Sequence, residues 1–84
     1  MHPDVKDVKP FPDYKLLLTF DNNEKRFFDM YPSLDKGIFK QLKDPAIFNS
    51  VHISFDTIEW NNGADLCPEM LYKESTTTDQ TTAQ

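Results

Sequence analysis

The stretch IFKQLKDPAIFNSVHISFDTIEWNNGADLCPEMLY, from Ile38 to Tyr72, is the most informative part of the sequence about the fold. It combines an amphipathic helical segment, a strand pair and the start of a last helix. Val51, Ile53 and Phe55 alternate with polar residues, which predicts a half-buried strand. Thr57 to Trp60 is its expected hairpin partner. This pattern indicates a fold and not a reaction.

The end of this stretch carries turn and capping signals. Asn61-Asn62-Gly63 predicts a turn. Cys67-Pro68-Glu69 then has the order of a cap position, a first-turn proline and an acid that suits the helix dipole. We therefore expect a short helix through Leu71 and Tyr72.

The first part of the chain predicts three strands. Val5 to Pro10 is a short edge strand, because the prolines of Pro10-Phe11-Pro12 remove backbone donors. Tyr14 to Phe20 alternates apolar side chains and is the strongest strand signal. Asp21 to Glu24 fits a tight turn, and Lys25 to Met30 is the returning strand.

Between the strand groups, the sequence predicts short helices. Ser33 is the expected N-cap of a helix, and apolar residues at four-residue spacing form one stripe toward the sheet: Leu34, Ile38 and Leu42. Gly37 interrupts this segment, so two short pieces are expected to meet there. Asp44-Pro45 is a cap and a first-turn proline, and it starts a turn that buries Ile47 and Phe48.

Together these elements predict an α+β fold. We expect a small antiparallel sheet of about four to five strands with short helices packed on one face. Residues 1–73 form a single domain, and the polar residues 74–84 form a disordered tail, since they lack large apolar side chains.

Charge and cysteine content favour some settings over others. The formal net charge of -5 disfavours direct binding to nucleic acid or to anionic lipid. The single Cys67 cannot form an intramolecular disulfide, which favours a reducing cytoplasm. The longest apolar run, Leu16 to Leu18, is too short for a membrane span.

No catalytic residue, cofactor or metal site is predicted. His2 with Asp4 could chelate a transition metal, but a frayed terminus explains them as well. His52 falls on the polar side of its strand, which favours a solvated side chain over a base. Cys67 at a helix start is the best nucleophile candidate, although a cap position accounts for it.

Two surface interpretations remain open. Trp60, Asp65 and Cys67 could line a site for a small ligand or a cation. The alternative is that the polar residues of this segment serve only as caps and turn residues. Trp60, Tyr72 and Phe39 are candidates for a protein interface, as is the edge strand around Val5 to Lys9. A cluster of basic residues could meet an acidic partner or, more simply, form a solvated helix face. Its members are Lys36, Lys40 and Lys43.

The chain also resembles a known family. The similarity covers roughly Val5 to Lys73, and its segments are PDYKLLLTF (Pro12–Phe20), Phe28-Asp29, LDKGIF (Leu34–Phe39), Leu42, Asp44-Pro45, Phe48, TIEW (Thr57–Trp60), NGADLCP (Asn62–Pro68) and Leu71-Tyr72. The run from Thr57 to Tyr72 is the most specific. These residues resemble the small bacterial domain of unknown function family DUF2442.

The resemblance implies an α+β domain with an antiparallel sheet and no established activity or catalytic set. Some members carry a C-terminal helix-turn-helix domain, from which the polar tail of this chain departs, and others are encoded beside small partner proteins in an arrangement that suggests toxin–antitoxin pairs. Asn23 and Asp56 stand where glycine is common in the family, and both are expected to reach positive φ.

The leading hypothesis is therefore a non-enzymatic protein-interaction or regulatory module, antitoxin-like, with an unknown partner such as a neighbouring gene product. Self-association into a homodimer through the Val5–Lys9 edge is an alternative partner arrangement. A ligand- or cation-binding domain near Trp60, Asp65 and Cys67 is the alternative function. A cysteine enzyme requires His52 within hydrogen-bond reach of Cys67.

Overall fold

The computed structural model describes residues 3–77. Its elements in chain order are strands β1 (Val5–Phe11), β2 (Lys15–Phe20) and β3 (Lys25–Asp29), 3-10 helices η1 (Tyr31–Ser33) and η2 (Gly37–Lys43), helix α1 (Pro45–Phe48), strands β4 (His52–Ser54), β5 (Thr57–Glu59) and β6 (Asp65–Leu66), helix α2 (Pro68–Glu74) and strand β7 (Thr76–Thr77). The α+β class is confirmed.

The strands form two antiparallel sheets, so the prediction of one sheet with four to five strands is wrong. One sheet has the order β1-β2-β3-β7, and the other has the order β4-β5-β6. β1 lies at a sheet edge, as predicted, and its pairing with β2 carries an irregularity between Val5 and Asp7. Bulges and prolines such as Pro10 limit further pairing at a sheet edge.

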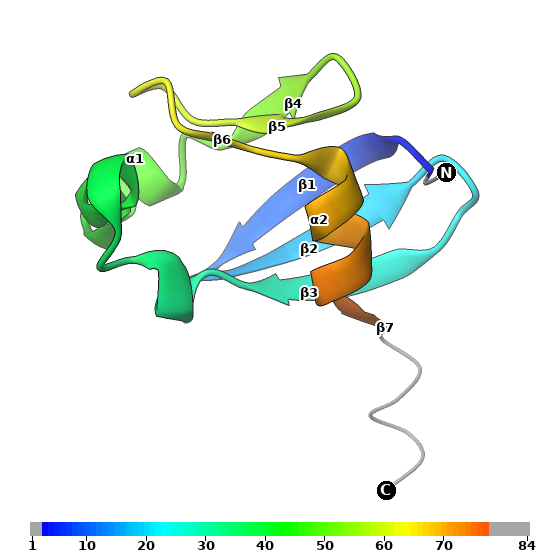
Figure 1. Ribbon diagram of the computed structural model, residues 1–84, viewed down its shortest axis with the longest axis horizontal. Coiled ribbons are helices and arrows are strands. Elements are labelled where there is room, and N and C mark those ends of the chain that lie inside the picture. The colour runs from blue at the N-terminus through cyan, green and yellow to red at the C-terminus, as the bar shows by residue number, and fades with distance from the viewer. Residues whose placement is uncertain (1–2, 78–84) are drawn as a thin grey trace, which may run out of the picture.

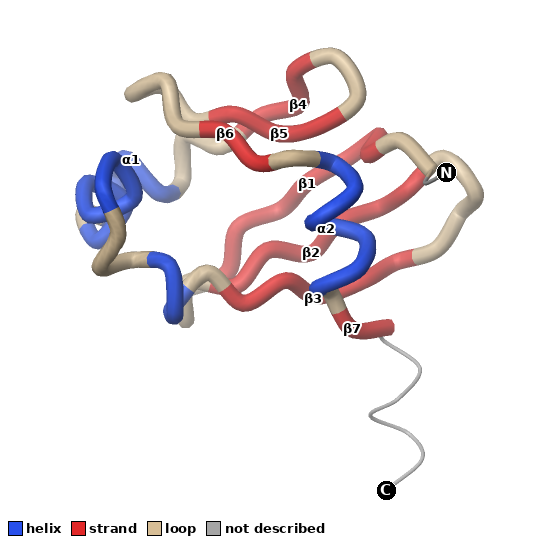
Figure 2. Tube along the Cα trace, in the orientation of Figure 1, coloured by secondary structure: helices blue, strands red, loops and turns tan. Residues whose placement is uncertain are grey.

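The second sheet lies above the first in Figure 1, and α2 crosses in front of the first sheet. The blue segments of Figure 2 show the helical region around α1 at one end of the sheets. Leu42 of η2, Phe48 of α1 and Leu71 of α2 join the same core as the inward-facing residues of β2.

The core lies between the two sheets, α2 and the helical region. Leu16, Leu18 and Phe20 point inward from β2 and are fully buried, as the alternation predicts. The other buried apolar residues come from every layer: Val5, Phe28, Met30, Leu34, Leu42, Phe48, Ile58, Trp60, Ala64, Leu66 and Leu71. A core made by all layers holds both sheets in one unit.

The segment before α1 is 3-10 helix, which corrects two predictions. Ser33 ends η1 and Met30 occupies its N-cap position, so Ser33 is not an N-cap. Ile38 is 43% exposed, although the four-residue spacing placed it toward the sheet. A 3-10 helix has three residues per turn, so Phe39 and Leu42 share its inner face instead. The predicted break is confirmed, since η2 starts at Gly37 with a φ of 50°.

The β4–β5 hairpin corrects the prediction for Phe55. Ser54 pairs with Thr57, so Phe55 and Asp56 form a two-residue turn and Phe55 does not continue the strand. Positive φ falls on Phe55, at 57°, and not on Asp56 as expected. The favoured two-residue hairpin turns need positive φ at their first central position. Phe55 occupies that position, so Phe55 and not Asp56 has positive φ. In the β2–β3 turn, Asn23 has a φ of 72°, as expected.

The C-terminal part of the described chain extends beyond the predicted domain. Residues 74–77, assigned to the tail by their composition, complete α2 and form β7, which pairs with β3. The rest of the predicted tail, residues 78–84, lies outside the described residues, as does His2. Within residues 3–77, no helix has the length and apolar character needed to cross a membrane.

Candidate functional site

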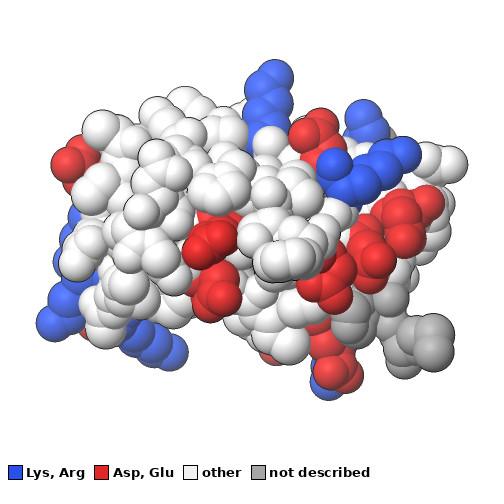
Figure 3. All heavy atoms as spheres, turned by 90° about the horizontal axis from the view of Figure 1, so that it is seen from above, with Lys and Arg blue, Asp and Glu red and all other residues white. Residues whose placement is uncertain are grey.

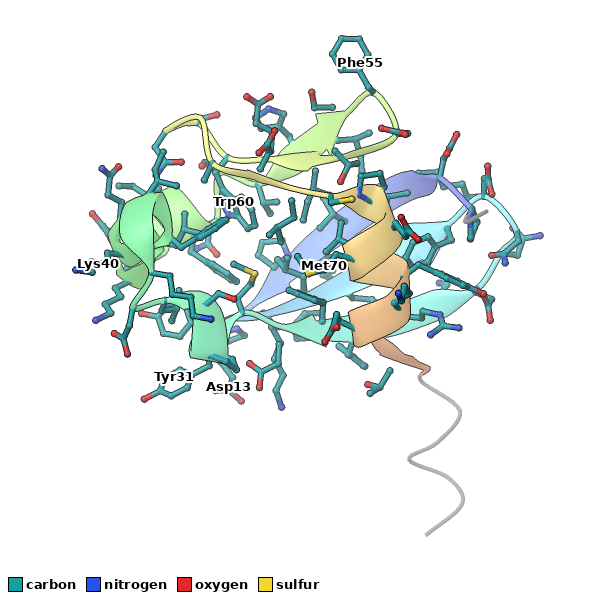
Figure 4. All side chains as sticks on the ribbon, viewed as in Figure 1. Asp13, Tyr31, Lys40, Phe55, Trp60 and Met70 are labelled. Atoms are coloured by element: carbon teal, nitrogen blue, oxygen red, sulfur yellow. The ribbon has the colours of Figure 1, made fainter. Side chains whose placement is uncertain are left out.

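Trp60 and Phe39 meet inside the molecule. Their rings pack edge to face with centroids 6.4 Å apart, and the indole N–H of Trp60 donates to the Phe48 carbonyl at 3.0 Å. Trp60 is 1% exposed. Figure 4 shows its side chain pointing inward between the second sheet and the helical region. In this structure Trp60 is a core residue that a surface partner does not reach.

Asp65 and Cys67 are both exposed, whereas Trp60 is buried. Asp65 pairs with Glu59 across β5 and β6, and Cys67 precedes α2 without a side-chain capping bond. Cys67 lines a hollow of about 230 Å³ beside Met70, formed by α2 residues. Among residues 3–77, no group of three or more His, Cys, Asp or Glu side chains is placed to hold a metal ion.

His52 is not brought into hydrogen-bond contact with Cys67. Its Nδ1 lies 3.0 Å from the Ser50 carbonyl, and its Nε2 lies 3.9 Å from a carboxylate oxygen of Glu59. β4 and β6 are separated by β5 in the second sheet, which places His52 and Cys67 on its two outer strands or beyond. The base that a Cys67 nucleophile needs is therefore not supplied by His52 here.

Tyr72 holds α2 against the first sheet. Its hydroxyl donates to Glu24 at 2.6 Å, and the Arg26 guanidinium lies over its ring. The hydrogen bond from Tyr72 is the largest cause that lowers the pKa of Glu24 below its ordinary value of 4.5, followed by the bond from Asn22. Tyr72 is half-buried, and its polar end is already satisfied within the chain.

The lysines around η2 include one ion pair. Lys43 bonds to Asp35 at 2.9 Å, with both side chains mostly exposed. The pair lowers the pKa of Asp35 and raises that of Lys43. Exposed pairs contribute little to stability. This finding fits the solvated-face interpretation of the lysine cluster.

Phe55 is the surface feature that sequence reasoning missed. Its side chain is 98% exposed at the tip of the β4–β5 hairpin, and it projects away from the molecule in Figure 4. Positive φ is costly for a bulky side chain, and such strain gathers where a site is built for function. The two-residue spacing between Ser54 and Thr57 was the signal that could have identified it, because it turns Phe55 from a strand position into a turn position.

A second missed feature is the pocket beside Tyr14, which we call the Tyr14 pocket. It has a volume of about 370 Å³ and is lined by Pro10, Phe11, Pro12, Tyr14, Pro45, Phe48 and Asn49. Tyr14 has a φ of 60°, packs edge to face on Phe48 at 5.2 Å and donates its hydroxyl to the Lys43 carbonyl at 2.5 Å. No charged side chain lines the pocket, which therefore suits an apolar group.

The model of a family described as "Protein of unknown function (DUF2442)" matches residues 5–77, from the start of β1 to the end of β7. No curated protein and no solved structure matches the chain.

Proposed function

Because the chain belongs to the DUF2442 family, whose description assigns no activity, we propose from its own surface that it is a non-enzymatic protein-interaction module. The single observation that carries this proposal is the almost complete exposure of Phe55. Burying a large aromatic ring that is exposed to water lowers the free energy, and aromatic residues are enriched where partners bind.

The backbone at Phe55 supports the same proposal. A residue such as Asn or Gly would adopt the positive φ of 57° with less strain, yet this hairpin carries Phe. Phe55 does not join the core, so the strain does not serve packing within the chain. A partner that buries the ring accounts for both the strain and the exposure.

The face that carries the second sheet is unevenly charged. Figure 3 views the molecule from above, the side of the second sheet in Figure 1, and shows few charged side chains over its left half. Acidic side chains are more numerous toward the right, and the labelled Phe55 lies right of centre in Figure 4. The proposal therefore rests on the exposed ring of Phe55 and not on an uncharged surrounding surface.

The biological setting is part of the proposal. The family resemblance points to a regulatory, antitoxin-like role beside a neighbouring gene product, and the single Cys67 favours a reducing cytoplasm. The alternative, a ligand or cation site near Trp60, Asp65 and Cys67, has less support, because Trp60 is buried and Asp65 does not line the hollow at Cys67.

Affinity purification from the native host tests the proposal. Tagged wild type and a Phe55→Asn variant serve as parallel baits, because Asn keeps the turn conformation and removes the ring. We expect a stoichiometric protein, either a different protein or the untagged copy of this chain, with the wild type only. Equal recovery by both baits, or no stoichiometric protein with either, would contradict the role of Phe55.

A further inference from the structure

We infer that the partner of Phe55 is a second copy of this chain, and that the ring of Phe55 enters the Tyr14 pocket of that copy. The inference rests on the proposed function and names its partner. The described chain offers an exposed apolar ring and a pocket without charged lining residues. The volume of the Tyr14 pocket, about 370 Å³, falls within the range of ligand pockets, which starts at about 300 Å³. The pocket therefore has room for one aromatic ring.

The positions of the ring and the pocket favour a two-fold dimer. The backbone N–H of Val5, at the start of β1, donates to the carbonyl of Asp56 at 3.1 Å, which fixes the hairpin tip at that end of the strand. Pro10 and Phe11, at the other end of β1, line the Tyr14 pocket. A two-fold axis across the middle of β1 brings each hairpin tip to the partner's pocket.

This arrangement uses both contacts at once. The seven residues of β1 separate the two features by about 20 Å at the usual strand rise. Each copy then buries one Phe55 ring and fills one Tyr14 pocket, so neither half of this contact is left open for a third copy. A closed pair is therefore expected instead of an open chain.

Asp56 and Lys9 carry opposite charges and lie toward opposite ends of β1. Asp56 lies next to Phe55, is exposed, and has no ion-pair partner among the described residues. Lys9 is exposed at the other end, with its ammonium 6.0 Å from the centroid of the Phe11 ring. When Phe55 enters the pocket, Asp56 approaches the Lys9 ammonium of the other copy. The net charge of -5 disfavours random contacts between copies, so the local pairing helps to select this one.

Residues 78–84, which lie outside the described residues, are a poor candidate to cover the pocket. Residues 78–84 read TDQTTAQ and contain no large apolar side chain. An apolar, proline- and aromatic-lined pocket gains little from such a segment. Phe55 of a second copy supplies the ring that the segment lacks.

Sedimentation equilibrium on the full chain tests the inference. We expect a monomer–dimer equilibrium for the wild type, and a dissociation constant at least about tenfold higher for Phe55→Asn. Phe55→Trp keeps a ring and is expected to keep the dimer. Tyr31→Ser is the matched control, since Tyr31 is 68% exposed and does not line the Tyr14 pocket. A monomeric wild type at millimolar concentration, a dimer insensitive to Phe55→Asn, or species larger than the dimer would each overturn the inference.

A charge exchange examines the geometry separately. Asp56→Lys and Lys9→Asp, each alone, place like charges together and are expected to raise the dissociation constant. The double variant restores opposite charges and is expected to recover most of the wild-type affinity. Purely additive losses in the double variant would show that these ends do not meet.

The purification described above separates this inference from the proposed function. Recovery of untagged copies of this chain by the wild-type bait, and not by Phe55→Asn, supports both. Recovery of a different protein that depends on Phe55, with a monomeric pure chain, supports the proposed function and overturns the second-copy inference. If the Phe55→Asn variant still recovers the same protein and still forms the dimer, both the proposed function of Phe55 and the second-copy inference are overturned.

Discussion

The guanidinium of Arg26 lies over the ring of Tyr72, with its central carbon 4.1 Å from the ring centroid. The same guanidinium donates from one nitrogen to the carbonyl oxygens of Tyr72 and Ser75, at 3.3 and 3.2 Å. Arg26 thus connects β3 of the first sheet to the C-terminal end of α2, where helix carbonyls lack partners within the helix. A single side chain combines stacking with helix capping.

Replacing Arg26 by Lys is expected to destabilise the fold by about 1–2 kcal/mol, because an ammonium keeps the charge but loses the planar stack and the shared bonds to two carbonyls. Urea unfolding followed by circular dichroism measures the change. Lys25→Ala, at the exposed neighbouring position, is the control and should stay within about 0.5 kcal/mol of the wild type. Equal stabilities for Arg26→Lys and the wild type would contradict the capping role.

The pKa of Glu24 should respond to Tyr72. The Tyr72 hydroxyl is the largest cause of its lowered pKa, so Tyr72→Phe is expected to raise it toward the ordinary 4.5. Because the folded pKa lies below the unfolded value, this carboxylate stabilises the fold above about pH 4.5 and loses that effect as the pH falls through its folded pKa. Carboxyl-carbon NMR titration of both proteins measures the shift. An unchanged Glu24 pKa in the variant would refute the assignment.

Trp60→Phe is expected to cost about 2–3 kcal/mol, since it opens a cavity in the core and leaves the Phe48 carbonyl without its indole donor. Urea unfolding by circular dichroism gives the free energy without relying on tryptophan emission. Tyr31→Phe, which alters an exposed ring only at its hydroxyl, serves as the control. A cost below about 0.5 kcal/mol would be typical of a surface position and incompatible with a buried Trp60.

Phe55→Asn is expected to leave the free energy of unfolding of the isolated chain unchanged or to raise it by up to about 1 kcal/mol, because Asn tolerates the left-handed conformation better. Thermal unfolding at a concentration where the wild type is monomeric measures this effect. Ile53→Asn, a half-buried position in the same hairpin, should instead destabilise. A clear loss for Phe55→Asn would mean that the ring packs within its own chain.

Much of the fold could be predicted because its signals are local. Alternation along Tyr14 to Phe20 identified β2, and the order Asp44-Pro45 identified the start of α1, where the Asp44 carboxylate accepts from the Ala46 N–H at 3.0 Å. The strands β6 and β7 were missed, because two residues carry no periodicity to read. Ile38 was misplaced because the helical period there is three and not 3.6.

The candidate site was less predictable, because exposure depends on the turn and not on residue type. Phe55 continued an apolar alternation in sequence, but the hairpin register placed it in the turn and outside the core. Trp60 has the composition of an interface residue, yet it is enclosed by Phe39, Phe48 and the second sheet. Neither outcome follows from hydrophobicity alone.

Patterns within short segments were enough to predict the α+β class, the main strands, the turns at Asn23 and Gly63 and the family resemblance, since these depend on periodicity, turn propensity and motif spacing. Three features appear only in the folded chain: the strands divide into two sheets, Trp60 is buried, and Phe55 and the Tyr14 pocket lie at opposite ends of β1. These features depend on contacts between residues distant in the chain, which local patterns do not encode.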